Sequence, residues 1–312
     1  MTTLLIDVSF LAHQAKATIP NLTAGDVGTG VTFGVLNRIL SLGKIFSTNQ
    51  MIFCFDSPTC SVRATTYLKY KGNRHNNKED QPPEERMIWS GFKKQIVELR
   101  ENVLPLIGWK NCWVVDGFEA DDIMAAFSRR ANTDNPAVIV TADQDLFQCI
   151  REHVACYNPS TKITTNVPAL KQRYGITPSQ WLQMKILAGC SGDNVDGIPG
   201  VAEKTAIKYI LKELPVTHKI YSVIREELPK IRERNFNLVS LPHPEFTGLP
   251  FIKPNEFSKK GFREVCEKYW LNSFLKPEAL VEWGKLFRGE FKGGSAPEAK
   301  ISHGTVTGRR RN

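Results

Sequence analysis

The first half of the chain alternates short apolar runs with longer amphipathic stretches. Residues 3–6, 51–55, 112–115 and 137–141 are short runs rich in apolar residues, as expected of buried strands. Helical periodicity runs from about Val31 to Phe46 and resumes after Glu119. Strands that alternate with helices predict an α/β fold with a mainly parallel central sheet flanked by helices. Two further runs, 154–157 and 163–165, predict a small hairpin.

The second half of the chain is mainly helical in pattern. Residues 178–187 and 202–211 predict two helices separated by a glycine-rich turn. Beyond Leu214 the chain is basic, helical in patches and interrupted by prolines, and a last helix is expected from Glu282 to Phe291. We therefore expect an α/β core over residues 1–175, a helical region over 176–291, and a basic, disordered tail over 292–312.

Composition narrows the classes of function. The 312 residues are 41% hydrophobic, enough for a sizeable core, and carry a formal net charge of +9. A basic protein suits a polyanionic partner, and nucleic acid is the first candidate. The cysteines form no C-x-x-C pair and the histidines no metal motif, which indicates reduced thiols of a cytoplasmic protein and argues against a zinc site. No apolar run in the sequence approaches the length of a membrane span.

Acidic residues stand where the predicted strands end and where the predicted helices begin. Carboxyl ends of parallel strands meet at one edge of a sheet, so these side chains should gather there. Hard divalent cations such as Mg²⁺ prefer carboxylate and water ligands and would relieve the repulsion within such a cluster. Any one of these acids is explained equally well as a cap or turn residue. The candidate metal ligands are Asp7, Asp56, Glu119, Asp121, Asp122, Asp143, Asp145, Asp193 and Asp196.

Two segments predict contact with nucleic acid. Residues 57–100 interleave basic and aromatic side chains, which neutralise phosphates and stack on bases, around a polar loop at 72–83. A solvated charged face explains any single residue there equally well. In the second segment, Gly197-Ile198-Pro199-Gly200 leads into a helix N-terminus, which attracts phosphate. The following Lys204-Thr205 pair forms no nucleotide-binding phosphate loop, because Glu203 stands where that loop requires glycine.

Several of these segments resemble the flap endonuclease and 5′-to-3′ exonuclease family, a PIN-like group with polymerase-linked and phage-encoded members. The resemblance covers residues 3 to about 212 and rests on 118–122, 141–145 and 192–206, with residues 67–74 similar to the arch motif of the family. It implies a helical arch within 57–100 and a helix-hairpin-helix DNA-binding region from 178 to 212. It also implies that Asp7, Asp56, Glu119 and Asp121 serve the tighter metal position, with the other acids completing the cluster.

The resemblance further implies the roles of individual residues and the function. Lys71 would face the scissile phosphate and act in catalysis with Asp121 and Asp143. The residues expected to contact DNA are Tyr70, Lys71, Arg74, Gly197, Gly200, Lys204 and Thr205. The implied activity is that of a two-metal, Mg²⁺-dependent 5′ nuclease, in which Mn²⁺ substitutes for Mg²⁺ and K⁺ binds the hairpin. It would act on flaps, nicks and branches of DNA in replication or repair.

The expected protein is a monomer without membrane contact, working with accessory replication proteins. Two alternatives remain open at this point. One is a nuclease specialised for RNA primers in RNA–DNA hybrids, which the acids do not distinguish from a DNA flap nuclease. The other is a catalytically silent scaffold that keeps the fold and its nucleic-acid-binding surface.

Overall fold

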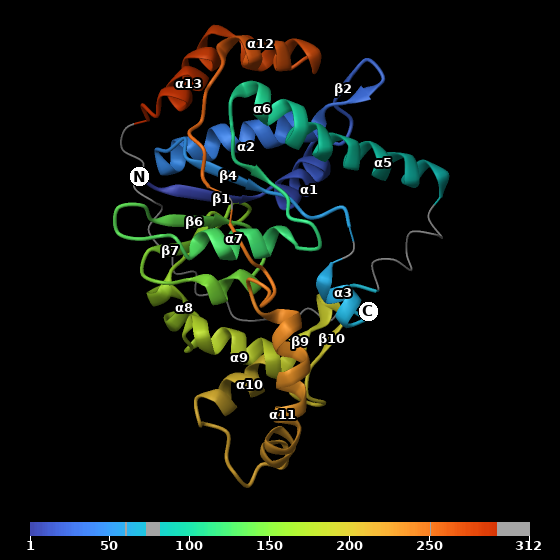
Figure 1. Cartoon of the computed structure of the whole chain (residues 1–312), viewed down its shortest axis with the longest axis vertical. Helices are drawn as coiled ribbons and strands as arrows, with labels where there is room; N and C mark the ends of the chain where they lie inside the picture. Colours follow the sequence, from blue (N-terminus) through green and yellow to red (C-terminus); the bar gives the residue numbers. More distant parts are fainter. Residues whose placement is uncertain (60, 73–81, 250, 292–312) are drawn as a thin grey trace.

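The computed structural model describes residues 1–59, 61–72, 82–249 and 251–291, arranged around a six-stranded sheet (Figure 1). The strand order is β5-β4-β1-β6-β7-β8. The first five run parallel and β8 pairs antiparallel with β7 at the edge. In chain order the strands are β1 (Thr3–Asp7), β4 (Met51–Cys54), β5 (Cys112–Trp113), β6 (Ala137–Val140), β7 (Val154–Asn158) and β8 (Ile163–Thr165). The predicted α/β fold is confirmed, and the predicted hairpin extends the main sheet.

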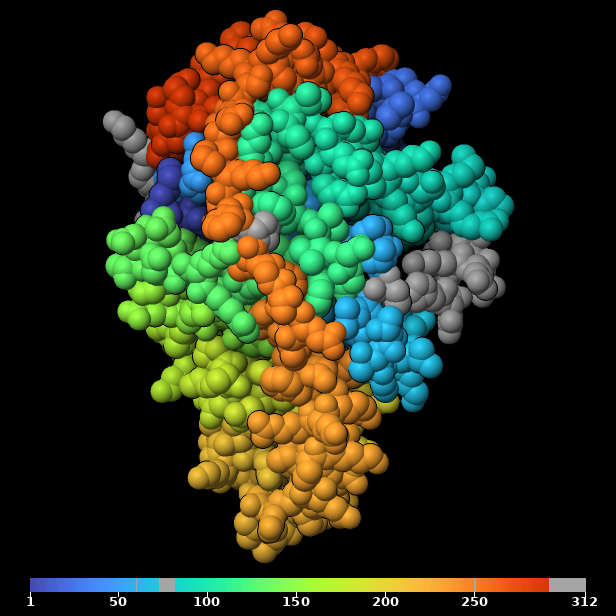
Figure 2. Space-filling view, in the orientation of Figure 1, coloured from blue at the N-terminus to red at the C-terminus, as the bar shows by residue number. Residues whose placement is uncertain are grey.

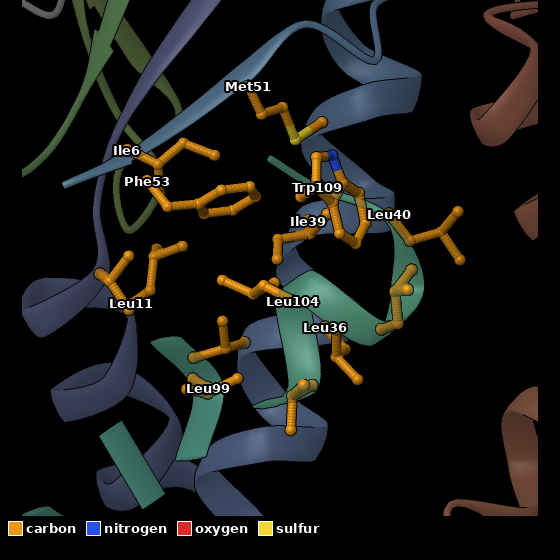
Figure 3. Packing of buried hydrophobic residues seen from close by; sticks show 14 of the residues in the cluster. Ile6, Leu11, Leu36, Ile39, Leu40, Met51, Phe53, Leu99, Leu104 and Trp109 are labelled. Carbon is orange, nitrogen blue, oxygen red and sulfur yellow. The ribbon is translucent and has the colours of Figure 1, made fainter. Parts of the chain in front are cut away.

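Helices cover both faces of the sheet. Leu4 and Ile6 of β1 pack with α1 (Val8–Thr18) and α2 (Gly30–Phe46), whereas Leu5 between them packs with α7 (Ala120–Ser128) on the other face. Because both faces are buried, the strands read as continuous apolar runs in the sequence. Figure 3 shows the first face, where Ile6, Phe53 and Leu36 lie among side chains that come from both strands and helices.

After the last strand of the sheet, the chain forms a group of helices at one end of the molecule. These are α8 (Val167–Tyr174), α9 (Pro178–Ala188), α10 (Glu203–Ile210) and α11 (Lys219–Val239). The turn between α9 and α10 contains two short paired strands, β9 (Gly189–Cys190) and β10 (Val195–Asp196), joined by a 3-10 turn at Ser191–Asp193. Buried residues of α9, α10 and α11 belong to the same apolar cluster as α7, so this end is continuous with the sheet.

The C-terminal helices lie at the opposite end of the molecule from α9–α11 (Figure 1). Phe262 of α12 (Lys259–Lys268) and Trp283 of α13 (Pro277–Arg288) belong to the apolar cluster of α2 and α6 (Leu104–Ile107). Within the predicted region 176–291, α12 and α13 therefore pack on the α/β core, and the division of the chain into domains stays a prediction. The chain between α11 and α12 runs over one face of the molecule to reach them (Figure 2). The last helix also begins earlier than predicted, at Pro277.

The remaining described elements are β2 (Thr23–Ala24), β3 (Val27–Gly28), α3 (Val62–Thr66), α5 (Pro83–Glu98), the π-helical turn Leu99–Val103 and the 3-10 turns Asp145–Cys149 and Asn272–Leu275. Residues 60, 73–81, 250 and 292–312 lie outside the described residues. The helical arch stays a prediction, as does the basic tail. Among the helices that the structure describes, none has the length and apolar character needed to cross a membrane.

Candidate metal centre

Asp7 and Asp56 stand at the carboxyl ends of the neighbouring parallel strands β1 and β4. Asp7 caps α1, because its Oδ1 accepts the Phe10 N–H at 2.9 Å, and its Oδ2 accepts the Thr141 hydroxyl at 3.0 Å. Asp56 Oδ1 accepts the Ala120 N–H at 3.0 Å. Each carboxylate is thus held by backbone or hydroxyl donors. The hydrogen bond to Asp56 also holds the start of α7 beside the edge of the sheet.

The start of α7 adds Glu119 and Asp121 to this edge. Glu119 Oε2 accepts a hydrogen bond from the Tyr70 hydroxyl at 3.1 Å and pairs with the Lys71 ammonium at 2.7 Å. Within the part of the chain that the structure describes, we find no hydrogen-bond donor to the Asp121 carboxylate. A carboxylate without donors in a crowded acidic site is a suitable ligand for a cation.

Burial and mutual repulsion perturb the acids of this edge. Burial, followed by the charge of Asp56, raises the pKa of Asp7 to about 7. Burial also raises the pKa of Asp121 well above its usual range, with the charge of Asp143 as the next cause. The pKa of Asp143 is raised by burial and then by Asp145. Without a compensating cation the charged forms of these carboxylates are disfavoured, so the set fits a divalent metal.

A second part of the centre lies in a cavity of about 480 Å³ beside the β9–β10 turn. One carboxylate oxygen of Asp145, one of Asp193 and the Cys190 sulfur lie within 4.8 Å of one another. Lys185 of α9 pairs with Asp145 at 3.0 Å and with Glu203 of α10 at 3.2 Å. Sequence reasoning missed Cys190 and Lys185. The signal for Cys190 was its place in the same glycine-punctuated turn as Asp193.

Asp122 does not belong to this cluster, which corrects its prediction as a metal ligand. Its two carboxylate oxygens each accept a hydrogen bond from the Arg63 guanidinium at 2.7 Å, and the side chain is fully buried. It also accepts the backbone N–H groups of Glu119 and His243. Arg63 in turn donates to the carbonyl of Ser240 at the end of α11. The pair therefore ties α3, α7 and the segment after α11 together.

Asp196 also lies apart from the other acids. Its side chain is 66% exposed, accepts the Tyr67 hydroxyl at 3.3 Å and lies 3.8 Å from the Lys69 ammonium. The structure thus places Cys190, and not Asp196, beside Asp193. Seven of the nine predicted acids are brought to one edge, namely Asp7, Asp56, Glu119, Asp121, Asp143, Asp145 and Asp193.

The predicted DNA-contacting residues belong to two places, the first around the start of α10 and the second in the sequence segment around Lys71. Gly197 lies where an added Cβ would stand 2.3 Å from the Ala188 carbonyl, and Gly200 has a φ of +79°, so both positions require glycine. Lys204 and Thr205 follow in the first turn of α10, with the Lys204 side chain exposed. At the second place the backbone N–H of Lys71 donates to the Asp193 carbonyl at 2.9 Å. Arg74 lies outside the described residues.

Comparisons with known proteins find relatives of this chain. Residues 2–175 match the family model described as the 5′-3′ exonuclease, N-terminal resolvase-like domain. Thermostable DNA polymerase I of Thermus thermophilus is 32% identical over 296 residues, which are 90% of this chain and 34% of that protein. This chain therefore spans about a third of the length of that relative.

Solved structures show the same fold at lower sequence identity. The T5 5′-exonuclease with bound zinc superposes with a TM-score of 0.64 at 19% identity, covering 78% of this chain and 90% of that one. The bacteriophage T5 flap endonuclease in complex with DNA and metal ions gives a TM-score of 0.63 at 18% identity, covering 93% of this chain and 99% of that one. The chain thus has the PIN-like fold of these nucleases.

The buried pair of Arg63 and Asp122 generates a stability prediction. Arg63→Met should lower the free energy of unfolding by about 3–5 kcal/mol, because it leaves the Asp122 carboxylate buried without its counter-charge. The double variant Arg63→Met, Asp122→Leu should recover much of that loss, since no lone charge remains. Urea denaturation of the variants measures both values. A single variant no less stable than the double one would contradict a structural role for Asp122.

Proposed function

The chain belongs to the 5′-to-3′ exonuclease family, and on that premise we propose that it is a Mg²⁺-dependent 5′ nuclease. It hydrolyses phosphodiesters near the 5′ ends of flaps, nicks and branches in DNA during replication or repair, and acts as a cytoplasmic monomer with accessory replication proteins. The observation that carries the proposal is the convergence of seven carboxylates on one sheet edge in a protein of net charge +9. Such a cluster suits divalent ions, and the basic remainder suits DNA.

The acids divide into two groups along the edge. Asp7, Asp56 and Asp121 form an all-oxygen group between β1, β4 and α7, with Glu119 beside them. Asp143, Asp145 and Asp193 line the neighbouring cavity. Bound there, two Mg²⁺ ions, or Mn²⁺ in their place, would activate a water and stabilise the leaving oxygen of a phosphodiester. Asp143 lines that cavity and also exerts the largest charge effect on Asp121, so it connects the two groups, which supports catalytic roles for Asp121 and Asp143.

Lys71 is suited to stabilise the charge that develops on the phosphate. In this structure Glu119 neutralises its ammonium at 2.7 Å, and the side chain is 23% exposed. The backbone of Lys71 has a left-handed φ of +53° and is held by its hydrogen bond to Asp193. An incoming phosphate would compete with Glu119 for this ammonium. Tyr70 contacts the same Glu119 oxygen and would fix its position. Arg74, three residues after Lys71 in the sequence, is proposed to contact phosphate as well.

The α9–α10 hairpin is suited to hold duplex backbone farther from the cut. Gly197 and Gly200 allow the tight turn, and the first turn of α10 presents Lys204 and Thr205 at the positive end of the helix dipole. A K⁺ bound by carbonyl groups of this hairpin would add to the attraction for phosphate. Lys71 would thus serve the chemical step, and this hairpin would serve the binding of duplex DNA.

A cleavage panel tests the proposed function. The substrates are 5′-labelled flap, nicked, blunt and RNA-primed duplexes, each assayed with Mg²⁺, with Mn²⁺ and with EDTA. We expect metal-dependent cleavage near the 5′ end, and loss of most of it in Asp143→Asn while DNA binding stays measurable, because that change removes metal-site charge alone. Cleavage confined to RNA-primed duplexes would favour primer removal. If no divalent metal supports cleavage, the nuclease proposal fails and the alternative of a catalytically silent scaffold is favoured.

Lys71 and Lys204 give matched variants for the two proposed roles. Lys71→Ala should lower the single-turnover rate about 100-fold or more at saturating enzyme with little change in affinity, because its charge acts on the transition state. Lys204→Ala should weaken binding in Ca²⁺ and flatten its salt dependence by about one phosphate contact. The reverse pattern, with affinity lost at Lys71 and rate lost at Lys204, would show that the roles are misplaced.

A further inference from the structure

The β9–β10 turn adds a sulfur donor to the acidic centre, and we propose that Cys190 is a metal ligand. Together with Asp145 and Asp193 it forms a mixed sulfur and oxygen position that prefers thiophilic divalent cations, such as Zn²⁺ and Co²⁺, to Mg²⁺. This inference rests on the proposed function, since it concerns the same centre. It assigns different metal preferences to the two groups of acids.

The donor atoms are spaced as ligands of one ion would be. The Cys190 sulfur lies 3.6 Å from Asp145 Oδ2. With metal–sulfur and metal–oxygen bonds of about 2.3 and 2.1 Å, a tetrahedral angle places sulfur and oxygen about 3.6 Å apart. The third donor, an oxygen of Asp193, lies within 4.8 Å of both. The cavity that these residues line gives an ion access from solvent.

The backbone holds Cys190 in this place. In the β9–β10 pair, Cys190 lies opposite Val195. The preceding Gly189 has a φ of +74°, and a Cβ there would stand 2.3 Å from the Val195 carbonyl oxygen. Only glycine fits that approach, so the position of the following thiol is set by the turn. No rearrangement of the strands is needed to bring the sulfur to the acids.

Lys185 orients the acid that faces the thiol. Its ammonium lies 3.0 Å from Asp145 Oδ1, which leaves Oδ2 directed to Cys190. Lys185 is buried and also pairs with Glu203 at 3.2 Å, so it is held on both sides. The Asp145 carboxylate therefore has one oxygen engaged by a fixed cation and the other available to an ion shared with Cys190.

The sulfur of Cys190 decides which metal ion this position prefers. A thiophilic cation forms a bond to the Cys190 sulfur as the S–H bond breaks, and the proton passes to solvent. Thiolate selects Zn²⁺ and its first-row neighbours, whereas Mg²⁺ favours carboxylate and water oxygens. Mg²⁺ binds at Asp145 and Asp193 through their carboxylates, but a thiophilic ion that also bonds the Cys190 sulfur binds there more tightly. At Asp7, Asp56 and Asp121, Mg²⁺ meets oxygen donors alone.

Cobalt absorbance tests this assignment on the full chain without DNA. Addition of Co²⁺ should produce the near-ultraviolet charge-transfer band of a thiolate–cobalt bond, and Zn²⁺ should displace it while Mg²⁺ does not. Cys190→Ser should abolish the band and weaken Zn²⁺ binding about tenfold or more. Cys190→Asp should lose the band but shift preference toward Mg²⁺. Cys112→Ser, at a partly buried thiol in β5, is the matched control and should keep the band.

The outcomes separate this inference from the proposed function. No band in the wild-type chain, or a band that persists in Cys190→Ser, overturns the assignment of Cys190. If Mg²⁺-dependent cleavage occurs in the same preparation without a band, the nuclease proposal stands and the sulfur ligand is rejected. If the band depends on Cys190 but no divalent metal supports cleavage, the sulfur ligand stands and the nuclease proposal fails.

Discussion

Repulsion among carboxylates at the carboxyl edge of the sheet is the constraint on which the rest of this structure depends. The parallel order of β4, β1 and β6 brings Asp56, Asp7 and Asp143 to the same edge. The first turn of α7 then adds Asp121. Burial and neighbouring charges raise the pKa values of Asp7, Asp121 and Asp143, so this edge costs stability until protons or cations compensate it.

Three basic side chains around this edge form ion pairs with different acids. Arg63 neutralises Asp122 in the interior and ties three segments together. Lys71 and Lys185 pair with Glu119 and Asp145 at the border of the cluster. None of these three replaces the proposed divalent ions, because the central acids are left to repel one another. The arrangement keeps a strongly negative centre inside a basic protein, which suits the proposed binding of both metal and DNA.

Much of the fold could be predicted from the sequence because its signals are local. Strands buried on both faces read as apolar runs, and parallel strands end at one edge, so the position of Asp7, Asp56 and Asp143 followed from the pattern. The helices on either side of the 189–202 turn were also evident, since glycine and proline mark their ends.

The errors concern contacts between distant segments. Asp121 and Asp122 are adjacent, yet successive residues of a helix point about 100° apart, and only the position of Arg63 shows which carboxylate turns inward. Asp196 was expected in the cluster and Cys190 was not, because the pairing of β9 with β10, which brings the Cys190 sulfur to Asp145, is not visible in local patterns. Trp283 packs in the N-terminal part of the core. The periodicity of its own helix shows which face is apolar but not which segment that face packs against.

The most direct test of the account is the thermal stability of the chain against pH, measured in EDTA and in Mg²⁺. A carboxyl whose pKa is raised on folding, as that of Asp7 is from 3.8 to about 7, destabilises the metal-free protein increasingly as pH rises across that interval. We therefore expect melting temperature in EDTA to fall from about pH 4 to pH 7, and Mg²⁺ to stabilise the chain most above that range. Asp121→Asn should melt higher than the wild type in EDTA and gain little from Mg²⁺. A variant that melts lower in EDTA and gains the full Mg²⁺ shift would contradict the central role of carboxylate repulsion.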